Sequence, residues 1–428
     1  MRAIITIDLG FGMSGKGSVI DALTFKNNTG LIVRTSGGSH CSQNVVLPDG
    51  THHCFSQFGS GLLANPTLKT LNSSDVKIEP LGMCIEAKRL ETLGIPDPLK
   101  QSYIHEECLI TTPYHIALNR IKELSRGENR YGSTGHGIGE TTDYFFAVAE
   151  LAPMIKHLRN RALLISVLKQ CQELITPQAV SCVDMQNPAC LAALELLKWS
   201  PEELATEYLA FAQATNIVDW EKSREILQAE EPPVIFQGSQ GVLLDSCCGF
   251  FPYVTSNDTT GCAAKTFISE MDISGETFTL GITRSYLTRH GLGPFPTEDE
   301  PTETSGMINT EAHNVFNEYQ RDFRMGWFDT QLFQYALGCA AECDALCVTH
   351  TEYFDKIKTV KIGVRYEEDG KPFLLRGEKG AEQTLDLSTA NVIYGFVKQS
   401  DFNTLLSVMS GLPVWMTSHG PTRHQKIM

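Results

Sequence analysis

The sequence predicts an α/β protein with a large, mostly parallel central sheet, a glycine loop and helical insertions. The first observation is a short β-rich run, residues 3–8, that leads into a glycine cluster at 10–17 and then into a helical pattern. A second apolar run follows at 31–33. Strand, glycine loop, helix and strand in this order open a βαβ unit, which requires parallel strands. Further strands of the sheet are expected at three later β-rich runs: 234–236, 277–282 and 345–348.

The middle of the chain is predicted to be mainly helical. Residues 115–125 and 149–230 carry helical periodicity, which is densest from 190 to 211, where Pro201 is expected to separate two helices. The sequence contains no repeat, low-complexity tract or clear linker. We therefore expect one domain across 1–428, in which 149–230 is a mainly helical insertion between strands of a single sheet.

Composition excludes several classes of protein. The 428 residues carry 50 Asp and Glu against 35 Lys and Arg, for a formal charge of −15, which argues against a protein that coats nucleic acid. No stretch approaches the roughly 18 uncharged apolar residues of a membrane span. The first residues have an acid inside the apolar run and no small-residue cleavage site, unlike a signal peptide. Thirteen scattered cysteines fit reduced thiols. We expect a cytoplasmic enzyme with no membrane or nucleic-acid partner.

The glycine cluster follows most of the phosphate-loop pattern. Gly10, Gly15 and Lys16 have the required spacing, but Gly17 stands where Ser or Thr normally contacts magnesium. Glycines let backbone N–H groups approach phosphate oxygens, and Lys16 offsets their charge. The alternative is a glycine-rich turn with an exposed lysine.

Further segments carry a resemblance to a known family. They are 133–139 (STGHGIG), 237–245 (QGSQGVLLD), 249–257 (GFFPYVTSN), 288–298 (TRHGLGPFPTE), 326–329 (GWFD) and 420–423 (GPTR). In order and spacing they resemble the adenylosuccinate synthetases, from residue 3 to residue 423. The resemblance implies a homodimer with active sites near the interface. It also implies a two-step ligase reaction, in which a nucleoside triphosphate phosphorylates O6 of a 6-oxopurine nucleoside monophosphate and the amine of aspartate displaces that phosphate.

The resemblance also implies ligand sites. Residues at the family's acceptor-nucleotide positions are Ser133, Thr134, Gln240, Thr255 and Arg321. Residues at its donor-triphosphate positions are Gly12, Gly15, Lys16, Gly17, Glu352, Gly420 and Pro421. Arg321 and Arg324 remain to bind the carboxylates of the amino acid, whereas Glu318 and Asp322 would repel them. The implied cofactor is Mg²⁺, with Ser42 as its candidate ligand.

The chain departs from the family in the residues of the chemistry. The family's loop reads Gly-Asp-Glu-Gly-Lys-Gly, and its Asp is both magnesium ligand and base for the ring N1 proton. Met13 replaces that Asp, and a thioether can neither accept the proton nor hold magnesium well. Gln43 stands at the position of the catalytic His, with His40 three residues earlier. Ser14, His40 and Gln43, beside Lys16, are the residues left for catalysis.

The donor-reading position has changed as well. The family's Thr-Lys-Leu-Asp, whose Asp reads guanine, corresponds to 349–352 with Glu352 at its end. The longer side chain weakens the case for GTP and admits ATP. The family's partner-subunit arginine is missing, because 141–149 contains none.

These departures point to a repurposed enzyme. Phage-encoded relatives that act on dGMP to give 2-aminoadenylosuccinate are similar, since they too lack the loop Asp and favour ATP. Met13 or Ser14 leaves room for the 2-amino group of guanine. We therefore expect dGMP and ATP as substrates. The alternatives are IMP with GTP, another nucleotide or amine, and a nucleotide-binding protein without catalysis.

Other conspicuous residues have structural interpretations. Cys339, Cys343 and Cys347 would share one face of a helix that ran this far, as buried small hydrophobes rather than a metal site. Residues 52–54 (HHC) follow a turn and are interpreted as part of a β-hairpin. Arg289 either supports the Gly-Pro-Phe-Pro loop or contacts a ligand, and the sequence leaves both open.

Overall fold

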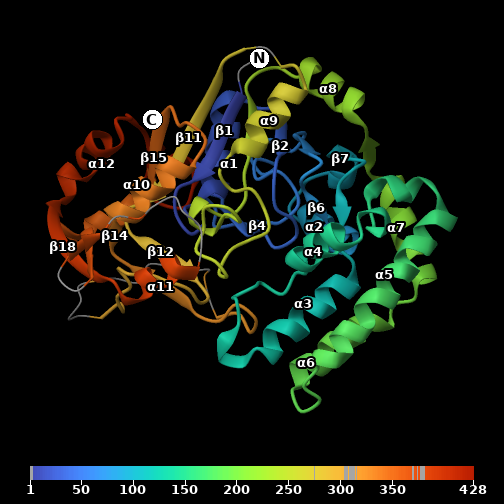
Figure 1. Ribbon diagram of the computed structural model, residues 1–428. Helices are drawn as coiled ribbons and strands as arrows, with labels where there is room; N and C mark the ends of the chain where they lie inside the picture. Colours follow the sequence, from blue (N-terminus) through green and yellow to red (C-terminus); the bar gives the residue numbers. More distant parts are fainter. Residues whose placement is uncertain are drawn as a thin grey trace.

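The computed structural model describes residues 3–273, 275–302, 307, 314, 316–368, 371–373, 375 and 381–428, with the backbone alone for 381–383 and 385. A ten-stranded sheet runs through the molecule (Figure 1). Its strands are β1 (Ala3–Asp8), β2 (Leu31–Arg34), β5 (Lys69–Asn72), β7 (Ser102–His105), β9 (Asn216–Val218), β10 (Val234–Gln237), β11 (Thr277–Arg284), β15 (Ala345–Thr349), β19 (Val414–Ser418) and β20 (Lys426–Ile427).

The strand order is β20-β19-β15-β11-β1-β10-β2-β5-β7-β9, and every neighbouring pair is parallel except β19 and β20. All five runs that the sequence predicts as strands lie in this sheet, so the α/β prediction is confirmed. All six residues of β1 are buried, as expected for a parallel strand covered on both faces. Ile4 packs in one core cluster and Ile5 and Ile7 in the other, which follows from the two-residue period of a strand.

Helices cover both faces of the sheet (Figure 1). They are α1 (Lys16–Asn27), α2 (Pro80–Thr92), α3 (Pro113–Ser125), α4 (Ile138–Ala147), α5 (Arg161–Cys182), α6 (Pro188–Leu194), α7 (Pro201–Ala214), α8 (Trp220–Ala229), α9 (Cys262–Glu270), α10 (Thr330–Cys339), α11 (Ala381–Thr389) and α12 (Phe402–Ser410). In the described ranges, no helix is both long and apolar enough to span a membrane.

Smaller sheets flank the large one. Their strands are β3 (Gln43–Val46) with β4 (His52–Phe55), β6 (Lys77–Ile78) with β8 (Leu109–Ile110), β12 (Leu287–His290) with β13 (Phe323–Gly326), and β14 (Phe328–Asp329), β16 (Thr359–Glu368), β17 (Lys371–Phe373) and β18 (Asn391–Lys398) together. The predicted hairpin at 52–54 is confirmed, because β4 pairs antiparallel with β3 and His52 Nε2 lies 2.7 Å from Asn44 Oδ1.

The segment 149–230 contains α5 to α8, but it is not helical throughout. Its β9 pairs parallel with β7 and forms an edge of the main sheet, so the segment adds a strand to the sheet. Pro201 begins α7, where Ser200 and Glu203 form a capping box, and this confirms the predicted boundary. The division of the chain into one domain stays a prediction.

The condition for a shared helical face of the three cysteines, a helix that continues to Cys347, is not met. Helix α10 ends at Cys339, Cys343 lies in the connection beyond it, and Cys347 belongs to β15. Cys343 and Cys347 are nevertheless buried among apolar side chains, as small hydrophobes are.

Candidate active site

The glycine loop connects the carboxyl end of β1 to the first turn of α1. Gly12 and Gly15 have φ values of 85° and 76°, in the left-handed region that glycine adopts without strain. A Cβ on Gly17 would lie 2.8 Å from the carbonyl oxygen of Asn44, so the approach of β3 leaves no space for the Ser or Thr of the usual pattern. The loop is further fixed by Arg284 Nη1 and Thr349 Oγ1, which donate to the carbonyls of Met13 and Ser14, each at 3.0 Å.

A carboxylate lies beneath this loop, and the sequence analysis did not single it out. Asp8 Oδ1 accepts from the Gly10 amide at 3.0 Å and from Ser14 Oγ at 2.8 Å. Its Oδ2 accepts from the Ser14 amide at 3.0 Å and from Lys16 Nζ at 2.9 Å. The available signal was an acidic residue that ends a buried strand two positions before the loop's first glycine.

A cavity of about 550 Å³ opens above the loop, large enough for a nucleotide-sized ligand. The predicted residues that line it are Gly12, Gly15, Lys16, Gly17, His40, Ser42, Gln43, Thr134, Gln240, Glu352, Gly420 and Pro421. Met13 lines it too, together with three histidines that the sequence analysis did not select: His136, His290 and His350. Segments far apart in the sequence therefore meet in one cavity at the carboxyl ends of the central strands, where open α/β sheets bind ligands.

Two of the three catalytic candidates have their side chains committed elsewhere. Ser14 is 2% exposed, donates to Asp8 and does not line the cavity. Gln43 donates from Nε2 to the Gly238 carbonyl and accepts from Ser60 Oγ, both at 3.0 Å.

His40 is different, because neither of its buried ring nitrogens makes a hydrogen bond of ordinary geometry among the described residues, although the Gln240 side chain interacts with the ring. Burial lowers the pKa of His40 to about 3, so its imidazole is neutral at physiological pH. Burial also lowers the pKa of His136, to about 4. A neutral imidazole has one nitrogen that can accept a proton, but a pKa of about 3 makes His40 a weak base in this structure, so a role as base requires that a bound nucleotide raise this pKa.

The predicted acceptor-nucleotide residues are partly brought together. Thr134 and Gln240 line the cavity. Thr255 does not line the cavity. Its hydroxyl accepts at 2.9 Å from Asn257 Nδ2, which in turn lies 3.4 Å from Gln240 Oε1, so Asn257 connects Thr255 to a residue of the lining. Ser133 Oγ donates to Asn119 Oδ1 at 2.8 Å and lies outside the lining.

The two predicted arginines also lie outside the lining. Arg321 donates to both carboxylate oxygens of Glu128, at 2.7 and 2.6 Å. Arg324 donates to Glu298 at 2.7 Å and to the carbonyls of Gly291 and Gly293 at 3.0 and 2.9 Å. Their role as carboxylate binders stays a prediction.

The donor end of the cavity is formed by Glu352 and the C-terminal segment. Glu352 Oε2 is buried without a partner in the described part of the chain, and burial raises the pKa of Glu352. Lys426 Nζ donates to the Gly420 carbonyl at 2.6 Å. Arg423 donates to both oxygens of Asp21 on α1, at 2.8 and 2.9 Å, so this segment is fastened to the helix that follows the glycine loop.

The described side chains offer no ready-made cage of ligands for magnesium. Within the described ranges no three His, Cys, Asp or Glu residues are grouped to hold a metal ion. Ser42 Oγ lies 2.9 Å from Cys54 Sγ, and the four acceptor positions of Asp8 are filled. Magnesium prefers free carboxylate, phosphate and water oxygens, which these residues do not offer.

Arg289 supports the neighbouring loop. Its Nε and Nη1 donate to the carbonyls of Leu292 and Pro294 at 3.0 and 2.7 Å, and its guanidinium lies 4.3 Å from the centre of the Phe11 ring. The sequence left two interpretations of Arg289 open, and the geometry agrees with the one in which it supports the Gly-Pro-Phe-Pro loop.

Comparison with known proteins adds the family. A profile of the adenylosuccinate synthetases matches residues 5–399. The chain belongs to the adenylosuccinate synthetase family. It is 28% identical to the adenylosuccinate synthetase of Vibrio vulnificus, over 99% of this chain and 98% of the relative. It is 29% identical to that of Hamiltonella defensa, over 100% of this chain and 97% of the relative. The predicted family and its class, a carbon–nitrogen ligase, are confirmed.

Two solved structures share the fold. The fully ligated adenylosuccinate synthetase of Plasmodium falciparum has a TM-score of 0.79 at 18% identity and covers 99% of both chains. The succinoaminodeoxyadenylate synthetase of cyanophage S-2L, solved with dGMP and dATP, has a TM-score of 0.63 at 14% identity and covers 100% of this chain and 95% of its own. At these identities the likeness concerns the fold of this adenylosuccinate synthetase family member.

Proposed function

We propose that this protein joins aspartate to dGMP at the expense of ATP and forms 2-aminoadenylosuccinate in its deoxyribose form. The observation that carries the proposal is Met13, which lines the cavity where the family's loop presents an aspartate. A methionine side chain leaves a neutral surface for a purine with a 2-amino group. The carboxylate of this loop, Asp8, instead lies beneath it and is fully hydrogen-bonded.

The reaction divides into two displacements. In the first, O6 of the purine attacks the γ-phosphorus, the bond to the bridging oxygen breaks, and ADP leaves. The N1 proton passes to His40, whose buried neutral ring becomes a stronger base when the anionic phosphates bound in the cavity raise its pKa. In the second, the amine of aspartate attacks C6, the C6–O bond breaks, and phosphate leaves with that oxygen and a proton from the amine. His40 then returns its proton to water.

Binding groups support this sequence of steps. Lys16 and the loop amides hold the donor phosphates, and Thr134 and Gln240 hold the acceptor nucleotide. Arg321, Arg324, Ser133 and Thr255 belong to the proposal as the family's counterparts, although they lie outside the cavity lining. Members of this family generally depend on Mg²⁺, which would take its oxygen ligands from the donor's phosphates and water, since the described side chains offer no cage for it. The proposal includes a homodimer and a cytoplasmic location.

A second candidate is ordinary adenylosuccinate synthesis from IMP, aspartate and GTP. The observation in its favour is the unpartnered Oε2 of Glu352, which can accept N–H bonds from guanine. The same oxygen can accept from the 6-amino group of adenine, so Glu352 does not separate the two donors.

The test is release of phosphate with ATP or GTP, magnesium and aspartate against IMP, GMP, dGMP and dIMP. Turnover with dGMP and ATP, and little with IMP, is expected. Turnover confined to IMP and GTP refutes the proposal in favour of the ordinary synthetase. If no combination of acceptor and donor nucleotide releases phosphate although the nucleotides still bind, the enzyme uses another amine or the protein binds nucleotides without catalysis.

A further inference from the structure

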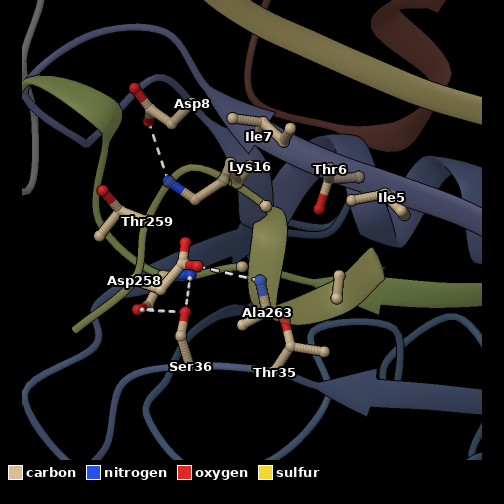
Figure 2. A pocket seen from close by; sticks show the side chains of 14 residues that line it. Ile5, Thr6, Ile7, Asp8, Lys16, Thr35, Ser36, Asp258, Thr259 and Ala263 are labelled. Carbon is tan, nitrogen blue, oxygen red and sulfur yellow. Dashed lines mark hydrogen bonds and ion pairs between the residues drawn. The ribbon is translucent and has the colours of Figure 1, made fainter. Parts of the chain in front are cut away.

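The ammonium group of Lys16 is held from below by two acceptors. Its Nζ donates to Asp8 Oδ2 at 2.9 Å and also to the backbone carbonyl of Gln240. Figure 2 shows the Lys16 side chain directed at the Asp8 carboxylate, with their ion pair drawn as a dashed line. The side chains are 5% and 0% exposed, so water screens this ion pair little.

Counting hydrogens shows what remains for a ligand. A lysine ammonium has three donor hydrogens, and Asp8 and Gln240 take two of them. Lys16 lines both the large cavity and the small one of about 10 Å³ beneath the loop, whereas Asp8 lines the small one alone. The third hydrogen is therefore left for a group in the large cavity.

The same count excludes two other roles for Asp8. Its two oxygens already accept four hydrogen bonds, from Gly10, Ser14 twice and Lys16, which fills the acceptor positions of a carboxylate. No position is left for a metal ion. Asp8 is 1% exposed and does not face the large cavity, so it has no route to a proton of the acceptor purine.

We propose that Asp8 is a positioning residue for the donor triphosphate, acting through Lys16. It keeps the ammonium at the base of the loop with one N–H directed to a phosphate oxygen. The lysine side chain is therefore already ordered before the donor binds, which lowers the entropic cost of binding. Three of the four donors to Asp8 come from the loop itself, so the same carboxylate fixes the loop conformation and the lysine together. This inference rests on the donor site of the proposed function and is independent of the acceptor nucleotide and the amine.

The test is the affinity of the full-length protein for tripolyphosphate, measured by calorimetry without acceptor or amino acid. Asp8→Asn keeps the shape of the side chain but loses the charge, and we expect at least about fivefold weaker binding. In a Lys16→Met background, adding Asp8→Asn is expected to change the affinity by less than about twofold, because the effect passes through the lysine. Ser36→Ala is the matched control, with less than about a twofold change, because Ser36 lines the same small cavity but its hydroxyl contacts Ser239 rather than Asp8 or Lys16.

Several results overturn the inference. They are unchanged or tighter binding by a folded Asp8→Asn variant, an equal loss of affinity in the Lys16→Met background, and a wild-type protein that does not bind tripolyphosphate. Folding is checked by thermal unfolding. If Asp8→Asn does not fold, Asp8→Ser, which is smaller and keeps one acceptor oxygen, is measured with the same expectation. Wild-type binding of tripolyphosphate without turnover of dGMP refutes the proposed function and leaves this inference standing.

Discussion

The ion pair between Arg423 and Asp21 fastens the donor-covering segment to α1, and its removal has a pH-dependent cost. The side chains are 8% and 1% exposed. Burial raises the pKa of Asp21 from 3.8 to about 6, against the attraction of Arg423, which lowers it. Arg423→Met removes the charge but keeps an apolar stem beside Phe25, whose ring centre lies 5.3 Å from the guanidinium.

The expected magnitude follows from burial. Removing one partner of a buried ion pair costs about 3–5 kcal/mol, because the other charge is left without compensation. We therefore expect the free energy of unfolding of Arg423→Met to fall by about 3 kcal/mol at pH 8, where Asp21 is ionised. At pH 5, Asp21 is mostly protonated in the wild type, and we expect a loss below about 1 kcal/mol.

The sign of the wild-type dependence is opposite to that of an ordinary paired carboxylate. Because the folded-state pKa of Asp21 is raised, the folded protein binds this proton more tightly than the unfolded chain does. The contribution of Asp21 is therefore greatest below pH 3.8 and declines by about 3 kcal/mol as pH rises through 6. Without Arg423 the pKa is higher still, so the decline in the variant continues above pH 6.

The assay is urea unfolding at pH 5 and pH 8. Arg365→Met is the matched control, because Arg365 is 55% exposed in its pair with Glu367 and is expected to cost less than about 1 kcal/mol at both pH values. Equal losses at the two pH values, or a larger loss at pH 5, would show that Asp21 is not the group that Arg423 compensates.

Three further predictions concern the site. His40→Ala is expected to lower turnover at least about a hundredfold if His40 takes the N1 proton. A loss under about threefold excludes that role. His424→Ala is the control, because His424 is exposed. Gly17→Ala forces a Cβ against the backbone of β3 and is expected to destabilise by about 1–3 kcal/mol in thermal unfolding, whereas Gly139→Ala, where the space is open, is expected to be close to neutral. Glu352→Gln is expected to raise the KM for the donor at least about threefold with a smaller change in kcat, because a hydrogen-bond acceptor of full charge is lost; an unchanged KM means that the donor base does not contact this side chain.

The sequence predicted five of the ten strands of the main sheet, each a short buried run next to a glycine or polar turn, and gave no prediction for β5, β7, β9, β19 and β20. It could not place β9, which has three residues and lies inside a helical stretch, since pairing with β7 rather than local preference makes it a strand. The cysteine row shows a related limit of reasoning from spacing. A helical spacing across 339–347 says nothing about where the helix stops, and α10 ends at Cys339.

The candidate site, like the fold, could be predicted only in part from the sequence. The glycine loop was located by its spacing and the other site residues by the resemblance to the family, and most of them line one cavity. What spacing could not reveal was which side chains are already satisfied. Ser14, Gln43 and Ser42 are suitable residue types, but hydrogen bonds to Asp8, Gly238, Ser60 and Cys54 occupy them.

This chain differs from the family in the position of the carboxylate at the glycine loop. The family's loop presents a carboxylate to the reacting purine, where it serves as base and metal ligand. In this chain the loop carries Met13 in that place, and its carboxylate is Asp8, beneath the loop and saturated with donors. A buried anion placed there interacts with Lys16 and thus with the donor phosphates rather than with the acceptor ring.

The base must then come from elsewhere in the cavity, and His40 is the candidate whose buried ring nitrogens make no hydrogen bond of ordinary geometry among the described residues. In the proposed division of roles, Asp8 positions the donor and His40 removes the proton, whereas one aspartate of the family binds the metal and removes the proton. Loss of Asp8 is accordingly expected to act on donor binding, and loss of His40 on turnover.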